Sequence, residues 1–212
     1  MLTRPWPPRS DDEYRREAEA LLPSELRAAF AALRLLVFDA DGVLTAANII
    51  YGLDGEALKE FDSRDGFGLA QAHAAGLKLA LLTGRPSPIA ARRCRDLGFD
   101  VVKLDRFDKL AALGEILRQA GCAPQETAYM GDDVLDIPAL DAVALPISVP
   151  EAPAEVRERA RWVTRAAGGR GAVREITDLT LKLQGLYGKA LLKLAAGPSP
   201  HAGPDAPGEA GS

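Results

Sequence analysis

The sequence contains few of the residues on which several classes of site depend. It has two cysteines, Cys94 and Cys122, and two histidines, His73 and His201. The cysteines lack the spacing of a zinc site or a disulfide framework, and two isolated histidines offer little for histidine-centred catalysis. Neither cysteine is followed six residues later by the arginine that a cysteine phosphatase needs in its phosphate-binding loop. The sequence therefore argues against all of these sites.

An excess of positive charge and a long apolar run are also missing. The net charge is −4 and the sequence pI is near 5.3, so there is no basic field to attract a nucleic acid. No apolar run approaches the length of a membrane span. The first residues, MLTRPWPPRSDDEYRRE, contain no apolar core of a signal peptide. We therefore expect a cytoplasmic protein with no nucleic-acid or membrane partner.

The length suits one domain with tails, because a domain typically takes about 150 residues. Residues 11–32 interleave charges with alanine and leucine, which predicts a helix that is broken near Pro23. We expect residues 1–32 to form an N-terminal helical extension outside the core and residues 33–190 to form the main domain. Residues 195–212 are rich in proline and glycine and are predicted to be disordered.

From residue 33 onward, short apolar runs alternate with longer amphipathic segments. This alternation indicates repeated βα units and a mainly parallel sheet flanked by helices. The apolar runs are continuous, as expected for strands buried on both faces. The predicted strands are Leu35–Phe38, Leu77–Leu82, Val101–Leu104, Thr127–Met130, Ala142–Ile147 and Trp162–Thr164. We expect a doubly wound α/β fold with a small β-hairpin insertion at Asn48–Phe61 and no large cap domain.

Carboxylates follow two of the predicted strands. Asp39 and Asp41 come directly after the first strand, and Asp132, Asp133 and Asp136 follow the fourth. Ligands of open α/β sheets bind outside the carboxyl ends of the strands, so these side chains are expected to share one site. Such carboxylates would repel one another unless a hard cation lay among them, and oxygen ligands favour Mg²⁺. The sequence therefore predicts a magnesium site.

Phosphate-binding groups follow the other two strands of this set. The second strand ends in Thr83-Gly84-Arg85, which offers a hydroxyl, an unobstructed backbone N–H and a guanidinium at one point. This donor set suits a phosphate group. After the third strand, Lys109 opens a predicted helix and can neutralise phosphate charge. The predicted ligand is therefore a phosphorylated small molecule.

These groups together predict phosphoryl transfer. A carboxylate beside Mg²⁺ and a bound phosphate can attack phosphorus in line, and we assign this role to Asp39. Asp41 can protonate the leaving alkoxide and then deprotonate the water that hydrolyses the acyl phosphate. The metal, Lys109 and Thr83 would neutralise the equatorial oxygens. The residues thus indicate a phosphatase that acts through a phospho-aspartate.

At these residues the sequence resembles the haloacid dehalogenase superfamily of phosphatases. The four motifs of that superfamily occur in order as DADGV, Thr83, Lys109 and GDDVLD. The resemblance implies that Mg²⁺ is held by the side chains of Asp39 and Asp132 and by the backbone carbonyl of Asp41. Asp133 and Asp136 would support these ligands, and the lysine of the third motif would steady the nucleophile and the phosphate.

A closer resemblance, over roughly residues 35–184, is to the 3-deoxy-D-manno-octulosonate 8-phosphate phosphatases. It rests on DGVLT, GEALKEF, SRDGFG, TGRPSPIAARRCRDLGF, DKL, AYMGDD and VTRAAGGRGAVREITDLTL. It implies release of inorganic phosphate and a free eight-carbon keto sugar acid in lipopolysaccharide precursor synthesis, by a homotetramer. Arg64 and Arg85 are candidates to bind the sugar-acid carboxylate or the phosphate. Arg170 and Arg174 are candidates to reach a neighbouring subunit's site.

The sequence leaves alternatives open. A phosphatase of a nonulosonate 9-phosphate, or of another small phosphomonoester, would share the catalytic residues and differ in the pocket, where Ala46, Asp62 and Phe107 depart from the family pattern. A signalling receiver domain also phosphorylates an aspartate, but it places that aspartate after the third strand, where this chain has Asp108-Lys109. A non-catalytic assembly protein of the same fold is disfavoured because every expected charged position is filled.

Overall fold

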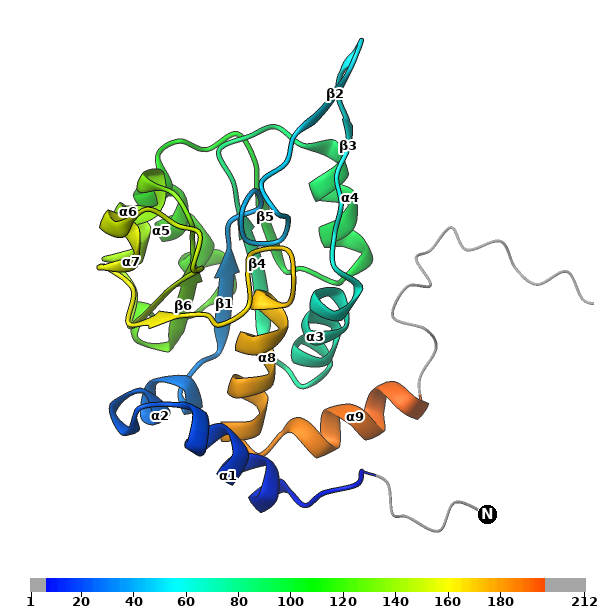
Figure 1. The fold of residues 1–212 in the computed structure, drawn as a ribbon, viewed down its shortest axis with the longest axis vertical. Helices are drawn as coiled ribbons and strands as arrows, with labels where there is room; N and C mark the ends of the chain where they lie inside the picture. Colours follow the sequence, from blue (N-terminus) through cyan, green and yellow to red (C-terminus); the bar gives the residue numbers. More distant parts are fainter. Residues whose placement is uncertain (1–6, 197–212) are drawn as a thin grey trace, which may run out of the picture.

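Six parallel strands form the central sheet of the computed structural model, which describes residues 7–196 (Figure 1). Their order across the sheet is β5-β4-β1-β6-β7-β8. The strands are β1 (Leu35–Phe38), β4 (Lys78–Leu82), β5 (Val101–Lys103), β6 (Thr127–Met130), β7 (Leu145–Ser148) and β8 (Trp162–Val163). The chain changes direction across the sheet at β1, which pairs with β4 on one side and β6 on the other. Such a switch point opens a crevice at the carboxyl ends of the strands, which is where ligands bind in these folds.

The predicted α/β fold is confirmed. The strands β5, β7 and β8 end one residue from their predicted ends, and β4 and β7 begin later than predicted for identifiable reasons. Leu77 is predicted to open β4, but its N–H bonds to the C-terminal turn of the preceding helix instead. Ala142 and Val143 are predicted to open β7, but their N–H groups bond back to the helical turn before them. In both places apolar residues belong to the end of the preceding helix, so the apolar run in the sequence begins before the strand does.

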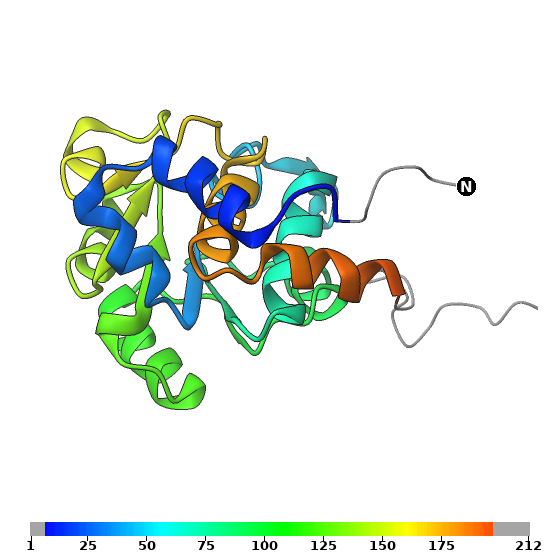
Figure 2. The same cartoon turned by 90° about the horizontal axis from the view of Figure 1, so that it is seen from below.

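Helices lie on both faces of the sheet (Figure 2). Helices α3 and α8 pack side by side on one face, and α5 contacts β4 and β5 on the other. The helices of the main domain are α3 (Ser63–Ala74), α4 (Pro88–Asp96), α5 (Lys109–Ala120), α6 (Ile137–Leu140), α7 (Ala154–Arg157), α8 (Ala172–Leu183) and α9 (Tyr187–Ala196), with 3₁₀ turns at Pro124–Glu126 and Val134–Asp136. No helix in residues 7–196 is long and apolar enough to span a membrane.

The N-terminal segment forms two helices, α1 (Asp11–Leu21) and α2 (Ser24–Ala31), which meet at the predicted break near Pro23. Both helices pack against α8. Their apolar faces belong to the hydrophobic core through Tyr14, Ala18, Leu22, Leu26 and Phe30. The segment therefore shares the core of the domain rather than lying outside it, because its apolar side chains recur every four residues and form a continuous stripe.

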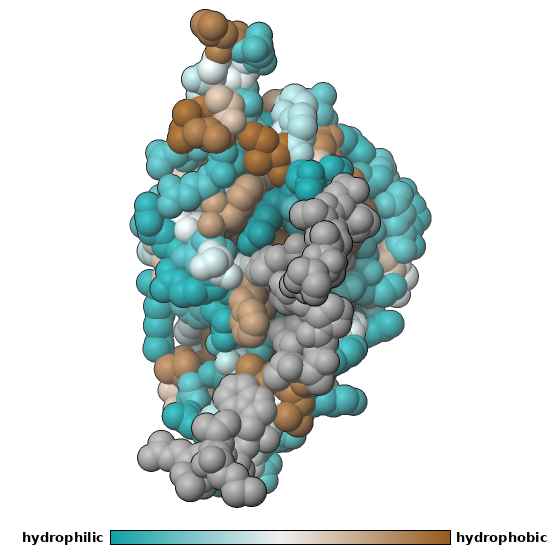
Figure 3. Space-filling view, turned by 90° about the vertical axis from the view of Figure 1, so that its right-hand side faces the viewer, coloured by the Kyte–Doolittle hydropathy of each residue, from teal (hydrophilic) through white to brown (hydrophobic). Residues whose placement is uncertain are grey.

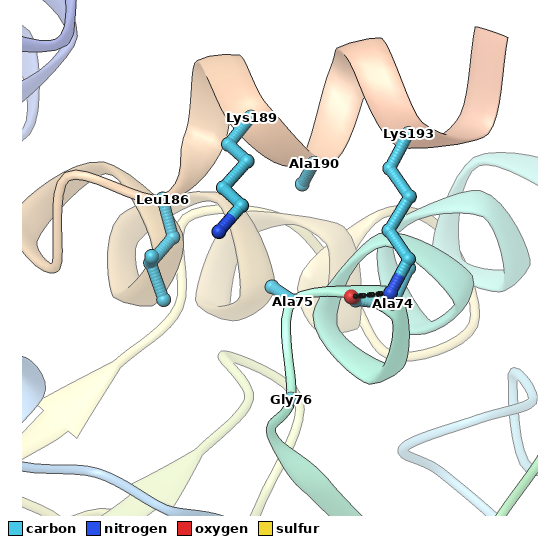
Figure 4. A pocket seen from close by; sticks show the side chains of 7 residues that line it. All are labelled: Ala74, Ala75, Gly76, Leu186, Lys189, Ala190 and Lys193. Atoms are coloured by element: carbon cyan, nitrogen blue, oxygen red, sulfur yellow. Dashed lines mark hydrogen bonds between the residues drawn. The ribbon is translucent and has the colours of Figure 1, made fainter. Parts of the chain in front are cut away.

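The C-terminal helix α9 crosses the end of α3 beside Ala75 and Gly76, just before β4 begins (Figure 4). The ammonium group of Lys193 donates to the carbonyl oxygen of Ala74 over 2.8 Å, which satisfies an end carbonyl of α3. A pocket of about 320 Å³ lies between the two helices. Because α9 ends at Ala196, it includes the first residues of the predicted disordered tail, and residues 197–212 lie outside the described part of the chain.

Candidate active site

The loop after β1 brings Asp39 and the acidic loop after β6 into contact. Asp39 is buried, and its N–H donates to the carbonyl oxygen of Met130 over 2.9 Å. Three residues later Gly42 has a φ of +93°, and a Cβ at this position would lie 1.9 Å from Asp132 Oδ2. Only glycine satisfies both requirements, so Gly42 permits the close approach of the two acidic loops.

Lys109 supplies a buried cation at the start of α5. Its ammonium nitrogen lies 2.7 Å from Asp39 Oδ1 and 2.9 Å from Asp136 Oδ1. It also donates to the carbonyl oxygen of Leu82 over 2.9 Å and contacts the hydroxyl of Tyr129 over 3.3 Å. Burial opposes the charged form of Lys109, but the carboxylates of Asp39 and Asp136 outweigh burial, so the pKa of Lys109 is raised. Lys109 therefore remains charged and holds Asp39 in place.

Asp136 uses both of its oxygens to shape the acidic loop. Oδ1 accepts from the hydroxyl of Tyr129 over 2.6 Å, and Oδ2 accepts from the backbone N–H groups of Asp132 and Asp133 over 3.0 and 3.2 Å. A Cβ at Gly131 would lie 2.5 Å from the Cβ of Asp136, which explains the glycine. Sequence reasoning misses Tyr129. Its signals are its place in the AYMGDD segment and a hydroxyl in a buried strand, which requires a hydrogen-bond partner.

The carboxylates of this site fit a hard divalent cation. Asp39, Asp132 and Asp136 each offer an oxygen, and these oxygens lie within 4.8 Å of one another. Asp132 Oδ1 is buried and has no hydrogen-bond partner in residues 7–196. Burial, followed by the charges of Asp39 and Asp136, raises the pKa of Asp132 to about 8. Burial and then Asp136 also raise the pKa of Asp39, against the effect of Lys109.

A cation among these groups would offset the cost of burying their negative charge. Because the oxygens of Asp136 are already engaged, Asp39 and Asp132 are the side chains that are left to hold it. An all-oxygen donor set of this kind suits Mg²⁺.

Asp41 contacts the base of the hairpin formed by β2 (Ile50–Gly52) and β3 (Gly55–Leu58). Its Oδ1 is ion-paired with the ammonium group of Lys59, which follows β3. Lys59 also lies 3.0 Å from Glu56 Oε2. Sequence reasoning assigns no role to Lys59, although this lysine lies in the GEALKEF segment, three positions after an acidic residue at the end of a predicted hairpin.

The loop after β4 places the predicted phosphate-binding groups beside the carboxylates. Thr83 is buried, and its N–H donates to the carbonyl oxygen of Lys103 over 3.0 Å. Arg85 donates to the hydroxyl of Tyr51 on the hairpin over 3.0 Å. A pocket of about 270 Å³ results, lined by Asp39, Asp41, Ala47, Ile49, Thr83, Gly84, Arg85, Phe107, Lys109, Asp132, Asp133, Leu135 and Asp136. The structure thus brings together all the predicted metal, catalytic and phosphate-binding residues except two arginines, Arg64 and Arg170.

Arg64 and Arg174 have their side chains engaged elsewhere. Arg64 Nη2 lies 2.6 Å from Asp62 Oδ2 and 3.3 Å from the carbonyl oxygen of Arg170. Arg174 Nε lies 2.6 Å from Asp178 Oδ1, within α8. Within one protomer neither side chain lines the pocket, because local carboxylates hold both of them.

Arg170 lines a second hollow beside the first. This hollow measures about 310 Å³ and shares Asp132 and Ala47 with the pocket of about 270 Å³, which we call the acidic pocket. The loop that carries Arg170 lies directly on the loop after β1: Gly169 donates its N–H to the carbonyl oxygen of Val43 over 2.9 Å. A Cβ at Gly168 would lie 1.8 Å from the carbonyl oxygen of Gly42, so the close packing of the two backbones requires glycine at position 168.

Comparisons with known proteins match this architecture. The family model of haloacid dehalogenase-like hydrolases matches residues 68–143. A curated relative from Escherichia coli K12, 3-deoxy-D-manno-octulosonate 8-phosphate phosphatase, is 41% identical over 158 residues, which cover 74% of this chain and 84% of the relative.

Two solved structures of such phosphatases superpose on the chain. The cobalt-bound form from Haemophilus influenzae is 38% identical, with a TM-score of 0.73, and the match covers 75% of this chain and 93% of that one. The Moraxella catarrhalis enzyme, in complex with magnesium, phosphate and KDO, is 34% identical, with a TM-score of 0.75 and coverage of 78% and 95%.

Proposed function

Because this chain belongs to the 3-deoxy-D-manno-octulosonate 8-phosphate phosphatase family of haloacid dehalogenase-like hydrolases, we propose that it hydrolyses that ester with Mg²⁺ as its cofactor. The products are inorganic phosphate and the free eight-carbon keto sugar acid, a lipopolysaccharide precursor, and the reaction takes place in the cytoplasm. The observation that carries the proposal is the pocket in which Asp39 and Asp132 face Thr83 and Lys109. These are the groups that phosphoryl transfer to a carboxylate requires.

We assign a task to each group on the basis of its position in the pocket. Lys109 holds Asp39 Oδ1, which leaves Oδ2 to attack phosphorus. Bound Mg²⁺ would supply positive charge to the phosphate oxygens and to the attacking carboxylate. Thr83 and Gly84 line the pocket, and the hydroxyl of Thr83 and the N–H of Gly84 would donate to the same phosphate oxygens. Asp41 gives a proton to the leaving sugar oxygen and later removes one from the attacking water.

The sugar-acid part of the substrate needs cations beyond those that hold the phosphate. Arg85 lines the acidic pocket, and Arg170 lines the adjoining hollow. A keto-acid carboxylate in that hollow would meet the guanidinium of Arg170. Arg64 lies behind Arg170 and contacts its carbonyl oxygen. We therefore assign carboxylate recognition to Arg170 and Arg85, and Arg64, whose guanidinium is paired with Asp62, contributes through its contact with the carbonyl oxygen of Arg170.

A panel of phosphate esters tests the substrate. We expect kcat/KM for the octulosonate 8-phosphate to exceed that for glucose 6-phosphate by on the order of 10²-fold, because the hexose ester has no carboxylate for the arginines. The nonulosonate 9-phosphate is expected to fall between them. Arg170→Ala and Arg64→Ala should lower kcat/KM for the two keto acids and leave glucose 6-phosphate unchanged.

Arg92→Ala is a matched control, because among residues 7–196 Arg92 pairs only with Asp96 of its own helix on the exposed surface. Equal kcat/KM for the octulosonate and glucose esters would show that the carboxylate is not recognised. A higher value for the nonulosonate ester would assign the enzyme to that substrate instead.

We also propose a homotetramer in which the hairpin covers a neighbouring protomer's pocket. The hairpin projects from the domain, and apolar surface gathers at its tip (Figure 3). Leu53 is fully exposed, and the neighbouring apolar side chains Ile50, Tyr51 and Leu58 are exposed as well. Phe107 is exposed at the rim of the pocket. Exposed apolar clusters of this kind support association, and a covered pocket would exclude water from the reaction.

Sedimentation velocity tests the assembly. The wild type is expected to sediment as a tetramer, and Leu53→Asp combined with Leu58→Asp should give monomers with reduced kcat/KM, because the charges cannot be buried in an interface. Leu192→Asp on α9 is the control, since this leucine is exposed away from the hairpin. A fully active monomeric wild type would contradict the proposed assembly.

A further inference from the structure

Lys59 lies beside the pocket although no catalytic motif contains it. It follows β3 directly, and its side chain has no exposed surface. A buried ammonium group is unfavourable unless it is paired. Its partners are Asp41 Oδ1 and Glu56 Oε2, the latter at 3.0 Å. The hairpin therefore ends in a cation that is buried against Asp41.

The two oxygens of Asp41 have different surroundings. Oδ1 accepts a charge-assisted hydrogen bond from Lys59. Oδ2 is buried and has no hydrogen-bond partner among the described residues. Arg85 Nε lies 3.7 Å from Oδ2, which is beyond hydrogen-bond distance. Because Asp41 lines the pocket, Oδ2 is the oxygen that is free to act on a bound substrate.

Lys59 is itself held by a series of contacts. Glu56 binds Lys59 through Oε2 and accepts from the hydroxyl of Ser87 through Oε1. Ser87 caps α4, where its hydroxyl oxygen accepts from the N–H of Ala90 over 3.1 Å. The ammonium group is therefore tied to the start of a helix rather than placed on a mobile side chain. Such fixed neighbours are what hold a catalytic group in its productive orientation.

We propose that Lys59 is a positioning residue for Asp41, an inference that rests on the proposed phosphatase function. By binding Oδ1, Lys59 directs Oδ2 to the ester oxygen. In the first half-reaction Asp39 bonds to phosphorus, the bond from phosphorus to the sugar oxygen breaks, and the proton on Asp41 Oδ2 moves to that oxygen. In the second, water bonds to phosphorus, its proton moves to Asp41 Oδ2, and the bond to Asp39 breaks.

Two esters with different leaving groups separate positioning from a structural role. A sugar alkoxide needs a proton to leave, whereas 4-nitrophenolate leaves without one. Lys59→Met is therefore expected to lower kcat/KM for the octulosonate 8-phosphate by on the order of 10²-fold, and for 4-nitrophenyl phosphate by less than about fivefold. Lys59→Arg keeps the charge and should recover part of the loss with the sugar ester.

A double-mutant cycle tests whether Lys59 acts through Asp41. Asp41→Asn is expected to show the same selectivity between the esters as Lys59→Met. Adding Lys59→Met to Asp41→Asn should then change the rate by less than about threefold, because the partner is already lost. Lys189→Met on α9 is the matched control and should leave both rates unchanged. Lys189 lies near Gly76, before the start of β4, whereas the active site lies at the carboxyl ends of the strands.

The outcomes distinguish this inference from the proposed function. A wild type that hydrolyses neither ester with Mg²⁺ would contradict the phosphatase assignment itself. An active wild type in which Lys59→Met lowers both esters equally, or adds its full loss to that of Asp41→Asn, would overturn the role of Lys59 alone. If Lys59→Met does not fold, Glu56→Gln removes the second anchor of Lys59, and an equal loss on both esters would overturn the proposal in the same way.

Discussion

Asp39→Asn is expected to lower kcat by on the order of 10⁴-fold or more, because an amide is a poor nucleophile and no other group can take its place. Asp39 meets Lys109 through one oxygen and belongs to the cluster that fits a metal, whereas Asp136, which does the same, has both oxygens engaged in the loop. The same substitution removes a charged oxygen from the cation site, which should raise the Mg²⁺ concentration needed for any remaining activity. Phosphate release at saturating substrate and a Mg²⁺ titration measure both effects.

A matched control variant and removal of Mg²⁺ by a chelator test the role of Asp39 further. Asp141→Asn is a matched substitution at an exposed carboxylate that pairs with Arg159, and it should leave kcat unchanged. Thermal unfolding should show that Asp39→Asn folds, because the change removes a buried negative charge whose pKa is already raised by burial. Wild-type activity in excess chelator, or a rate for Asp39→Asn within tenfold of the wild type, would exclude the proposed mechanism.

The fold could be predicted from the sequence where one local pattern determines one element. The runs Leu35–Phe38 and Thr127–Met130 are wholly apolar or buried, and each coincides with its strand. The start of β7 could not be predicted, because Ala142 is apolar in both possible roles and only its hydrogen bond to the preceding helix decides. The packing of α1 and α2 into the core likewise depends on α8, which lies more than 140 residues away.

The site could be predicted because topology alone assembles it. Asp39, Thr83 and Asp132 follow β1, β4 and β6, which are neighbours in the sheet, so their meeting needs no knowledge of side-chain direction. Lys59 and Tyr129 could not be found in this way. Their roles depend on how the base of the hairpin lies against Asp41 and on which face of β6 carries the hydroxyl.

The arginines show that residue type alone does not identify a substrate-binding side chain. The guanidinium of Arg64 is suited to a carboxylate, but the carboxylate that it meets in the structure is Asp62, two residues earlier. Arg174 is likewise held by Asp178, four residues later on the same helix. Local ion pairs of this kind compete with a substrate. The residue type therefore identifies candidates, and the contacts decide which guanidinium is free.

Lys109 is the second position at which a single substitution should have a large effect. Its ammonium group lies between Asp39 and Asp136 and accounts for the only positive charge within 4 Å of either carboxylate in residues 7–196. It lowers the pKa of both Asp39 and Asp132, although burial raises the pKa of each by more. Without Lys109, the carboxylates of Asp39 and Asp132 would be harder to keep ionised, and Asp39 would lose the contact that directs its free oxygen to phosphorus.

Lys109→Ala is therefore expected to lower kcat by on the order of 10²-fold or more even at saturating Mg²⁺, which is the usual loss on removing a preorganised electrostatic donor. The variant should also unfold at a lower temperature, because removing one partner of a buried ion pair leaves the other uncompensated. Added Mg²⁺ should recover part of this stability, since the cation binds the same carboxylates, and it should not restore kcat. Lys189→Ala on the surface of α9 is the control for both measurements. A wild-type kcat in folded Lys109→Ala would mean that the metal alone neutralises the site and that Lys109 is dispensable for the reaction.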